Sequence, residues 1–311
     1  AWYSKGNTDA TTGEALVGAD GQDGTWGGAS VSFPRIQGAD AVGTVVNVGD
    51  QVEKSLIGQR VMIDGWLRDW DDPLNLAKTG YFGSECDGGY AQYTKVSHRQ
   101  IRPVESSLSD AELATYVCSY VTAENMLNRA KVTKEDTVLI TGASGGVGSA
   151  LIQLANRRGA RCIAMSGADK AVGVRAVGPY AVIDRSPGDL RSALLDAIGQ
   201  DFVDVVADVV GGALWPQLIE VISRGGRYTC AGAIAGPIVN FDLRTFYLRD
   251  LTFTGATVPP PGVFEDLVGY VERGEVRPLV AATYPLEKLR EAQQAFIDKR
   301  HVGNIVVVPG T

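Results

Sequence analysis

The chain has 311 residues, of which 45% are hydrophobic and 21% are charged, and its formal net charge is −7. These values are typical of a soluble globular protein of about two domains, and they exclude a disordered or collagen-like chain. The acidic balance argues against nucleic acid and anionic membranes as partners, because both usually leave a basic footprint. No apolar run reaches the ~18 residues of a membrane span. No signal-peptide core follows Lys5. The four widely spaced cysteines fit a reducing cytoplasm, and the expected partner is a small-molecule substrate.

The first hundred residues predict a small β-rich or barrel-like domain. Residues 6–30 are rich in Gly, Ala, Asp and Thr without periodicity, which indicates a long surface loop. Short apolar or alternating segments bounded by turn residues follow, and each predicts a strand. These segments are residues 41–49, 57–63 and 90–96.

A change of pattern near Ser109 marks the start of a second kind of structure. Ser109 and Glu112 form a capping-box signature, so a helix is expected to begin there. Beyond about Val121, helices alternate with continuous apolar strands, which is typical of a parallel, doubly wound sheet. The expected strands are 138–141, 161–165, 181–184, 203–208, 227–231 and 304–308; helices are expected over 149–158, up to 177, and over 286–299.

The glycine-rich turn between the strand at 138–141 and the next helix is the sharpest signal. Gly142 permits a tight turn, Gly145 and Gly146 let the backbone approach a pyrophosphate, and Gly148 lets helix and strand pack closely. A Walker loop is excluded because no Lys-Ser/Thr pair follows the turn. We therefore expect a dinucleotide site; the loop residues expected at the phosphates are Gly142, Ser144, Gly145, Gly146 and Val147.

The end of the strand at 161–165 selects the cofactor. An acidic residue there would bind the ribose 2′-hydroxyl of NAD, but this chain has Ser166, with Lys170 close behind and Arg185 after the next strand. Room and positive charge suit a 2′-phosphate, so NADPH is expected. In the alternative, Lys170 only solvates a helix start and Asp169 is the acidic group.

Several motifs together resemble the medium-chain dehydrogenase/reductase superfamily. They are residues 38–49, 87–93, 122–124, the glycine loop at 140–150, and the glycine pairs at 211–212 and 225–226. The resemblance implies an α/β fold in which a GroES-like β-rich domain, residues 1–121 plus 258–311, is interrupted by a doubly wound parallel Rossmann domain, residues 122–257. It also implies a homodimer, and that the family's first strands lie upstream of Ala1.

Cysteine and histidine bear on the branch of this superfamily. Cys86, Cys118, Cys162 and Cys230 are widely spaced, so neither a disulfide framework nor a zinc ribbon is indicated. Zinc alcohol dehydrogenases carry G-H-E where this chain has Gly38-Ala39-Asp40, which resembles the zinc-free quinone-oxidoreductase branch. We therefore expect no metal, although Cys118 resembles the last zinc-ligand position and could join Asp40 in a degenerate site.

The resemblance also implies individual contacts to the cofactor. Thr122 would lie against the nicotinamide, and Gly211, Ala233 and Ile234 near its ribose and carboxamide. The family often has Gly-Lys before its last strand, where this chain has Gly303-Asn304. The pattern places three candidate proton donors near the interdomain cleft, namely Tyr81, Ser84 and Tyr120.

A rival dehydrogenase family also fits the glycine loop. Short-chain dehydrogenases need a Y-x-x-x-K pair, and Tyr284 to Lys288 matches the bare pattern. Pro285 disfavours a helix that includes Tyr284, so this interpretation is weak. The expected function is a zinc-independent, NADPH-dependent oxidoreductase that transfers hydride to a quinone, enone or related activated carbonyl compound. A zinc-dependent alcohol dehydrogenase with unusual ligands and a non-catalytic NADPH-binding protein remain the alternatives.

Overall fold

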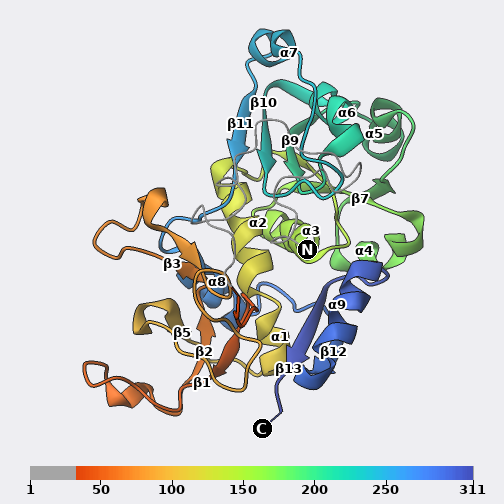
Figure 1. The fold of residues 1–311 in the computed structure, drawn as a ribbon. Helices are drawn as coiled ribbons and strands as arrows, with labels where there is room; N and C mark the ends of the chain where they lie inside the picture. The colour runs from red at the N-terminus through yellow and green to blue at the C-terminus, as the bar shows by residue number, and fades with distance from the viewer. Residues whose placement is uncertain (1–32, 311) are drawn as a thin grey trace.

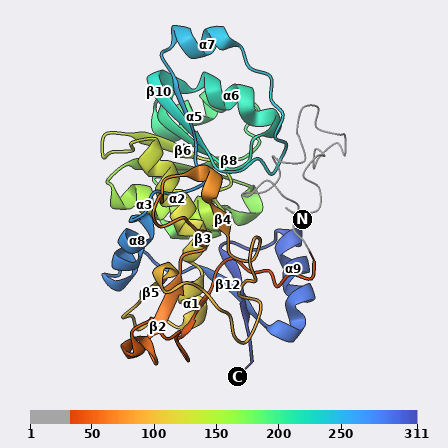
Figure 2. The ribbon, with the colours of Figure 1, turned by 60° about the vertical axis from the view of Figure 1, so that its left-hand side comes forward.

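The computed structural model describes residues 33–310, so the loop expected over residues 6–30 lies outside the described part. Two halves are visible in Figure 1. The upper one holds a parallel sheet with helices, and the lower one joins the orange N-terminal strands to the blue C-terminal elements. Figure 2 shows the same division from another side. The chain thus leaves the lower, β-rich half and returns to it, as the resemblance implies. The exact domain boundaries stay a prediction; the first falls inside helix α2 (Val117–Arg129).

The sheet of the upper half has six parallel strands in the order β11-β10-β9-β6-β7-β8. The strands are β6 (Thr137–Ile140), β7 (Arg161–Ser166), β8 (Ala181–Asp184), β9 (Val203–Asp208), β10 (Ile222–Cys230) and β11 (Thr252–Gly255). The chain winds outward from β6 to one edge and then from β9 to the other, which confirms the doubly wound prediction. In such sheets the crevice at the carboxyl ends of the two central strands is the usual ligand site.

Burial on both faces explains why the central strand β6 is apolar after its first residue. Val138 and Ile140 of β6 belong to a core with α2, α3 (Gly146–Arg157) and α8 (Val263–Glu272). Leu139, between them, belongs to a second core with α5 (Leu190–Ile198) and α6 (Trp215–Glu220). Successive side chains of a strand point to opposite faces, so both faces of this sheet are covered.

The β-rich half contains short strands in three small sheets. Strands β1 (Val42–Thr44), β2 (Arg60–Ile63) and β5 (Ile101–Pro103) are antiparallel; β3 (Trp66–Leu67) pairs with β4 (Gly80–Tyr81), and β12 (Val280–Pro285) with β13 (Asn304–Val308). The strand predicted over residues 90–96 is wrong. Its side chains alternate, but within the described part of the chain it forms no ladder with another strand.

Helix starts follow their capping chemistry. Helix α1 (Asp110–Ala114) begins as predicted: the Glu112 N–H donates to the Ser109 hydroxyl, and the Ser109 N–H donates to the Glu112 carboxylate. Helix α3 begins earlier than predicted, because the glycine loop itself forms its first turn. The remaining helices are α4 (Ala171–Val177), α7 (Leu243–Leu248) and α9 (Leu289–Asp298). No helix within residues 33–310 is long and apolar enough to cross a bilayer.

Candidate active site at the domain junction

The glycine loop joins β6 to α3 and has the shape that a pyrophosphate requires. Gly142 has φ +58°, a conformation that side chains rarely adopt. A Cβ on Gly148 would lie 2.2 Å from the Gly142 carbonyl oxygen, so only glycine fits there. No side chain caps the start of α3 at Gly145, which leaves the first N–H groups of the helix available. The residues present therefore fit a bound dinucleotide phosphate.

Asp208, at the end of β9, holds this loop in place. Its fully buried carboxylate accepts hydrogen bonds from the hydroxyls of Thr141 and Tyr228 and from the N–H groups of Val210 and Gly211. Thr141 immediately precedes the glycine loop. One carboxylate thus ties together the ends of the two central strands.

Replacing Asp208 with Asn should destabilise the protein. The amide keeps one acceptor oxygen but presents N–H donors where the hydroxyls and amides now donate, and hydrogen bonds to a buried charge contribute about 1.5–3 kcal/mol each. We expect urea unfolding to show a loss of about 2–4 kcal/mol. The exposed Asp196→Asn on α5 is the matched control; equal stability of the two variants would show that Asp208 does not anchor the loop.

The residues predicted for the 2′-phosphate lie together after β7. The Arg185 N–H donates to the Ser166 carbonyl at 3.1 Å, and the Lys170 N–H donates to the Gly167 carbonyl at 3.0 Å. The Arg185 side chain also approaches Gly167, with Nε 3.6 Å from the position of a Cβ there. Ser166, Lys170 and Arg185 therefore surround a single turn at the carboxyl edge of the sheet.

The loops after β9 and β10 bring the other predicted cofactor residues together. The Ala235 N–H donates to the Val210 carbonyl at 2.9 Å, and the Gly212 N–H to the Gly236 carbonyl at 3.0 Å. Gly211 and Ala233 thus lie on adjoining loops. Ile234, on the same loop as Ala233, is 66% exposed. Contact of these residues with a nicotinamide stays a prediction.

Helix α2 presents Cys118 and Thr122 on one face, four residues apart, where they meet the β-rich half. The hydroxyls of Tyr81 and Thr122 lie beside the Cys118 thiol, and they partly offset the effect of burial on its pKa. The ring of Tyr81 packs on Trp66, with centroids 4.6 Å apart. Asp40 accepts a hydrogen bond from the Cys118 N–H. Tyr81, Cys118, Thr122 and Asp40, which come from three separate segments of the chain, are named here the cleft cluster.

Burial controls the ionisation of the cleft cluster. It raises the pKa of Tyr81 well above its ordinary value, and the neighbouring Cys118 and Asp40 raise it further. Burial, assisted by Asp40, also raises the pKa of the Cys118 thiol to about 12. Tyr81 therefore keeps its proton at neutral pH and Cys118 is a poor nucleophile. The cluster offers a protonated hydroxyl as a hydrogen-bond donor but is not arranged to attack a substrate.

Asp40 supplies a pH dependence that the sequence did not reveal. Surrounding protein raises the pKa of its carboxyl from 3.8 to about 6, against the opposing effect of the Cys118 N–H. Folding therefore favours the protonated form, a stabilisation that is complete below the unfolded pKa of 3.8 and lost as the pH rises through about 6.

We expect Asp40→Asn to raise the Tm by about 1–3 °C at about pH 8 and to leave it unchanged at about pH 4. The gain is small because the side chain remains open to water. Thermal unfolding across this pH range tests the expectation. A variant less stable than the wild type at about pH 8 would contradict it.

Two of the other candidate donors are placed differently from the expectation. The prediction that Tyr120 lies near the cleft is wrong: its side chain is 1% exposed and belongs to the main core. Its hydroxyl donates to the Arg277 carbonyl at 2.9 Å and accepts from Gln153. Ser84 is buried in the turn after Tyr81. Tyr284 lies in strand β12, so the helical pairing with Lys288 that short-chain dehydrogenases need is absent.

Asp40 and Cys118 lie together, as the degenerate zinc site requires. Within residues 33–310, however, no group of three or more His, Cys, Asp or Glu side chains could hold a metal ion. A catalytic zinc usually has three protein ligands and a water. The described residues therefore do not fit a zinc ion by themselves.

Ser119 and Asn304 are site residues that the sequence reasoning missed. The Asn304 amide donates to the Thr115 carbonyl at 2.7 Å, and the Gly303 N–H donates to the Ser144 carbonyl at 3.1 Å. A Cβ on Gly146 would lie 2.2 Å from Asn304 Oδ1 and 2.4 Å from Ser119 Oγ. The segment before the last strand thus contacts the glycine loop. Asn304, at the start of that strand, stands where the family often has lysine. The only signal was that departure from Gly-Lys.

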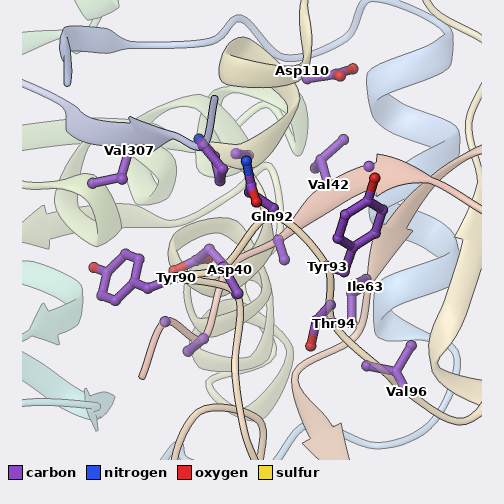
Figure 3. Close-up of a pocket in the computed structure, with 18 of the residues that line it drawn as sticks. Asp40, Val42, Ile63, Tyr90, Gln92, Tyr93, Thr94, Val96, Asp110 and Val307 are labelled. Carbon is purple, nitrogen blue, oxygen red and sulfur yellow. The ribbon is translucent and has the colours of Figure 1, made fainter. Parts of the chain in front are cut away.

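A groove of about 1400 Å³ opens from the cleft into the β-rich half. Figure 3 shows Asp40 and Tyr90 on its wall near one another, with Tyr93, Val96 and Ile63 farther along. Its body runs between β1, the segment 90–96, β13 and α9, and so lies away from the glycine loop. Among residues 33–310, the site residues that also line the groove are Asp40, Cys118, Ser119 and Asn304.

A Rossmann-type sheet with a glycine loop, facing a proton-donating cluster from a β-rich domain, defines a two-domain, dinucleotide-dependent oxidoreductase. Residues 11–106 match the alcohol dehydrogenase GroES-like domain family, and residues 146–273 match the zinc-binding dehydrogenase family. The chain belongs to the medium-chain dehydrogenase/reductase superfamily, and it is an oxidoreductase of that superfamily.

Three relatives show what the chain is similar to. A solved structure of a candidate alcohol dehydrogenase from Sinorhizobium meliloti 1021 is 44% identical with a TM-score of 0.91, over 99% of this chain and 84% of that one. The acryloyl-coenzyme A reductase of Metallosphaera sedula is 28% identical over 89% of this chain and 84% of its own length. A 2-octenoyl-CoA carboxylase reductase, solved with NADP and 2-octenoyl-CoA, is 28% identical with a TM-score of 0.82, over 88% and 68%.

Proposed function

We propose that the protein is a zinc-independent, NADPH-dependent oxidoreductase. Its substrate would be a quinone, an enone or a related compound with a carbon–carbon double bond conjugated to a carbonyl group. The observation that carries the proposal is the Tyr81 hydroxyl, which is buried beside Cys118 where α2 meets the β-rich half. A hydroxyl donor suits an acceptor that is already polarised, whereas a simple aldehyde or ketone benefits from a metal as Lewis acid. The acryloyl-CoA and 2-octenoyl-CoA relatives support the conjugated class, with 2-enoyl thioesters as its first members to test.

The cofactor would be held by residues from helix α2 and from the loops at the carboxyl ends of the strands. The glycine loop, from Gly142 to Val147, would bind the pyrophosphate, and Ser166, Lys170 and Arg185 the 2′-phosphate. Thr122, Gly211, Ala233 and Ile234 would surround the nicotinamide end. When bound, NADPH supplies the hydride. The relative solved with NADP supports this choice.

The chain's own residues would manage the proton. The Tyr81 hydroxyl lies beside the Cys118 thiol and would donate a hydrogen bond to the substrate when one is bound. As hydride adds to the β-carbon of the substrate, the α-carbon or the carbonyl oxygen takes the proton of Tyr81. Asp40, which belongs to the same cluster and is open to water, would return a proton from solvent to Tyr81. The balance is one hydride and one proton added across the double bond.

A substrate panel tests the proposal. NADPH oxidation is followed with acryloyl-CoA, simple enones and quinones, on protein whose metal content has been measured. We expect turnover with at least one conjugated acceptor by protein that lacks stoichiometric zinc. Inactivity with every acceptor, together with tight NADPH binding, would instead favour a non-catalytic NADPH-binding protein.

The cofactor choice has its own test. Removing both cations, Lys170→Met with Arg185→Met, should raise the KM for NADPH by about 10²-fold and leave that for NADH unchanged, since each charge-assisted bond contributes about 1.5–3 kcal/mol. Equal affinity of the wild type for NADH and NADPH would refute the cofactor assignment.

A zinc-dependent alcohol dehydrogenase is the second candidate. It is favoured by the contact between Asp40 and Cys118 and by the 44%-identical candidate alcohol dehydrogenase. Stoichiometric zinc and alcohol oxidation that a chelator abolishes would support it over our proposal. The homodimer and the cytoplasmic location stay predictions.

A further inference from the structure

Three basic residues in succession, Lys299, Arg300 and His301, lie between α9 and β13 in a chain whose net charge is −7. They belong to the returning part of the β-rich half, and the function proposed above gives them no role. Figure 1 shows α9 lying directly beneath α4, the helix that Lys170 precedes. The basic run is therefore close to the residues expected at the 2′-phosphate.

Direct contacts fix this segment against the dinucleotide domain. A Cβ on Gly173 of α4 would lie 3.0 Å from Val302 Cγ2, so the chain beside His301 touches α4. One residue later, the Gly303 N–H bonds to the glycine loop at Ser144. The segment thus spans from the glycine loop to the first turns of α4.

The Phe296 ring and the backbone position Lys299 and His301. Lys299 ends α9 in a left-handed conformation, φ +52°, and its ammonium lies 3.3 Å from the centroid of the Phe296 ring. The His301 ring lies against the same phenyl ring, with centroids 6.0 Å apart. Both side chains are therefore held by packing as well as by their backbone.

The charges of Lys170 and Lys299 act on the segment that contains His301. Burial lowers the pKa of Lys299, and the charge of Lys170 lowers it further. Burial likewise lowers the pKa of His301, followed by Lys299 on its own segment and Lys170 on the facing one. Among the described residues, no carboxylate is among the groups that shift either pKa. Asp169 is the carboxylate in the turn after β7, with its Oδ1 2.6 Å from the position of a Cβ on Gly167, beside Arg185. The basic side chains from the two domains outnumber it, which favours binding of an anion.

We propose that Lys299 and His301 close over the 2′-phosphate of NADPH bound at Ser166, Lys170 and Arg185, so that the β-rich half helps to select this cofactor. The inference rests on the proposed function, which supplies the phosphate. A phosphate monoester carries about −1.5 to −2 charges near neutral pH, and NADH lacks this group altogether. The β-rich half thus adds to the preference for NADPH over NADH, although the glycine loop and Ser166 lie in the other domain.

The test compares NADPH and NADH binding by fluorescence titration of the full-length chain. Lys299→Gln and His301→Gln should each weaken NADPH binding by about tenfold at about pH 6 and leave NADH binding within twofold. Both variants should keep the wild-type kcat at saturating NADPH. Arg290→Gln, an exposed charge at the other end of α9, is the matched control and should bind both cofactors as the wild type does.

A pH profile provides a readout that a merely structural role would not change. The 2′-phosphate should favour protonated His301, so NADPH binding relative to NADH should strengthen as the pH falls from about 8 to about 6. His301→Gln should flatten this rise, and Lys299→Gln should retain it. Variants that bind NADPH like the wild type, with an unaltered pH profile, would overturn the inference. A wild type without preference for NADPH would instead refute the proposed cofactor, so the two failures are distinguishable.

Discussion

Replacing Gly148 with Ala should unfold the nucleotide loop and abolish NADPH binding. The new methyl group would lie 2.2 Å from the Gly142 carbonyl oxygen and 2.7 Å from the Cα of Ala143, and both of these atoms are backbone. Neither can rotate away, so the loop and α3 must separate. We expect a loss of about 3 kcal/mol or more in the free energy of unfolding and a Tm lower by about 6–12 °C.

Gly145 provides the matched comparison in the same loop. A Cβ there would have its nearest neighbour at 3.4 Å, and its φ of −82° suits any residue. Gly145→Ala should therefore keep the Tm of the wild type but weaken NADPH binding by about 10²-fold, because the methyl group projects where the phosphate approaches. A stable Gly148→Ala variant, or unchanged NADPH affinity in Gly145→Ala, would contradict the loop's proposed role.

Tyr81→Phe should lower kcat with a conjugated acceptor by about 10²-fold, the usual contribution of a positioned general acid. The phenyl ring keeps the packing on Trp66, so the KM for NADPH and the Tm should change little. The measurement is steady-state kinetics over a range of pH, with NADPH saturating.

Tyr120→Phe is the control for this experiment. It removes a hydroxyl of the same kind, two residues from Cys118, that is bonded to the Arg277 carbonyl and Gln153 inside the core. This variant should lose stability but keep kcat. A Tyr81→Phe enzyme with kcat within twofold of the wild type would remove Tyr81 from the mechanism.

The parallel sheet was predictable because its signals are local. Strand Val203–Asp208 is mainly apolar because both faces of the sheet are buried: Val205 and Ala207 pack into one core, and Val203 and Val206 into the other. The glycine loop was equally readable, because the close approach at Gly148 permits no side chain. The capping box at Ser109 likewise depends only on neighbours in the chain.

Two predictions were wrong, the strand over residues 90–96 and the position of Tyr120, and only the first depends on partners distant in the chain. Residues 90–96 alternate like a strand, but a strand also needs a ladder, and no described strand provides one. The placement of Tyr120 could have been corrected from helix phase alone. Cys118 and Thr122 lie four residues apart on one face, which turns Tyr120 to the opposite side of α2.

The roles of Asp40 and Asn304 required the fold. Asp40 is far in sequence from Cys118, whose N–H it accepts, and Asn304 reaches the glycine loop from the other end of the chain. Lys299 and His301 gave only a compositional signal, a basic run in an acidic chain. Their approach to Lys170 follows from the return of the chain to the β-rich half.

The most direct test of the central claim is the rate of NADPH oxidation with acryloyl-CoA by protein that has been stripped of metal and analysed for zinc. We expect saturable turnover that added zinc does not increase, with a reduced thioester formed in equal amount to the NADPH consumed. Turnover that appears only after zinc is restored, or oxidation of simple alcohols in its place, would contradict a zinc-independent reduction of conjugated acceptors.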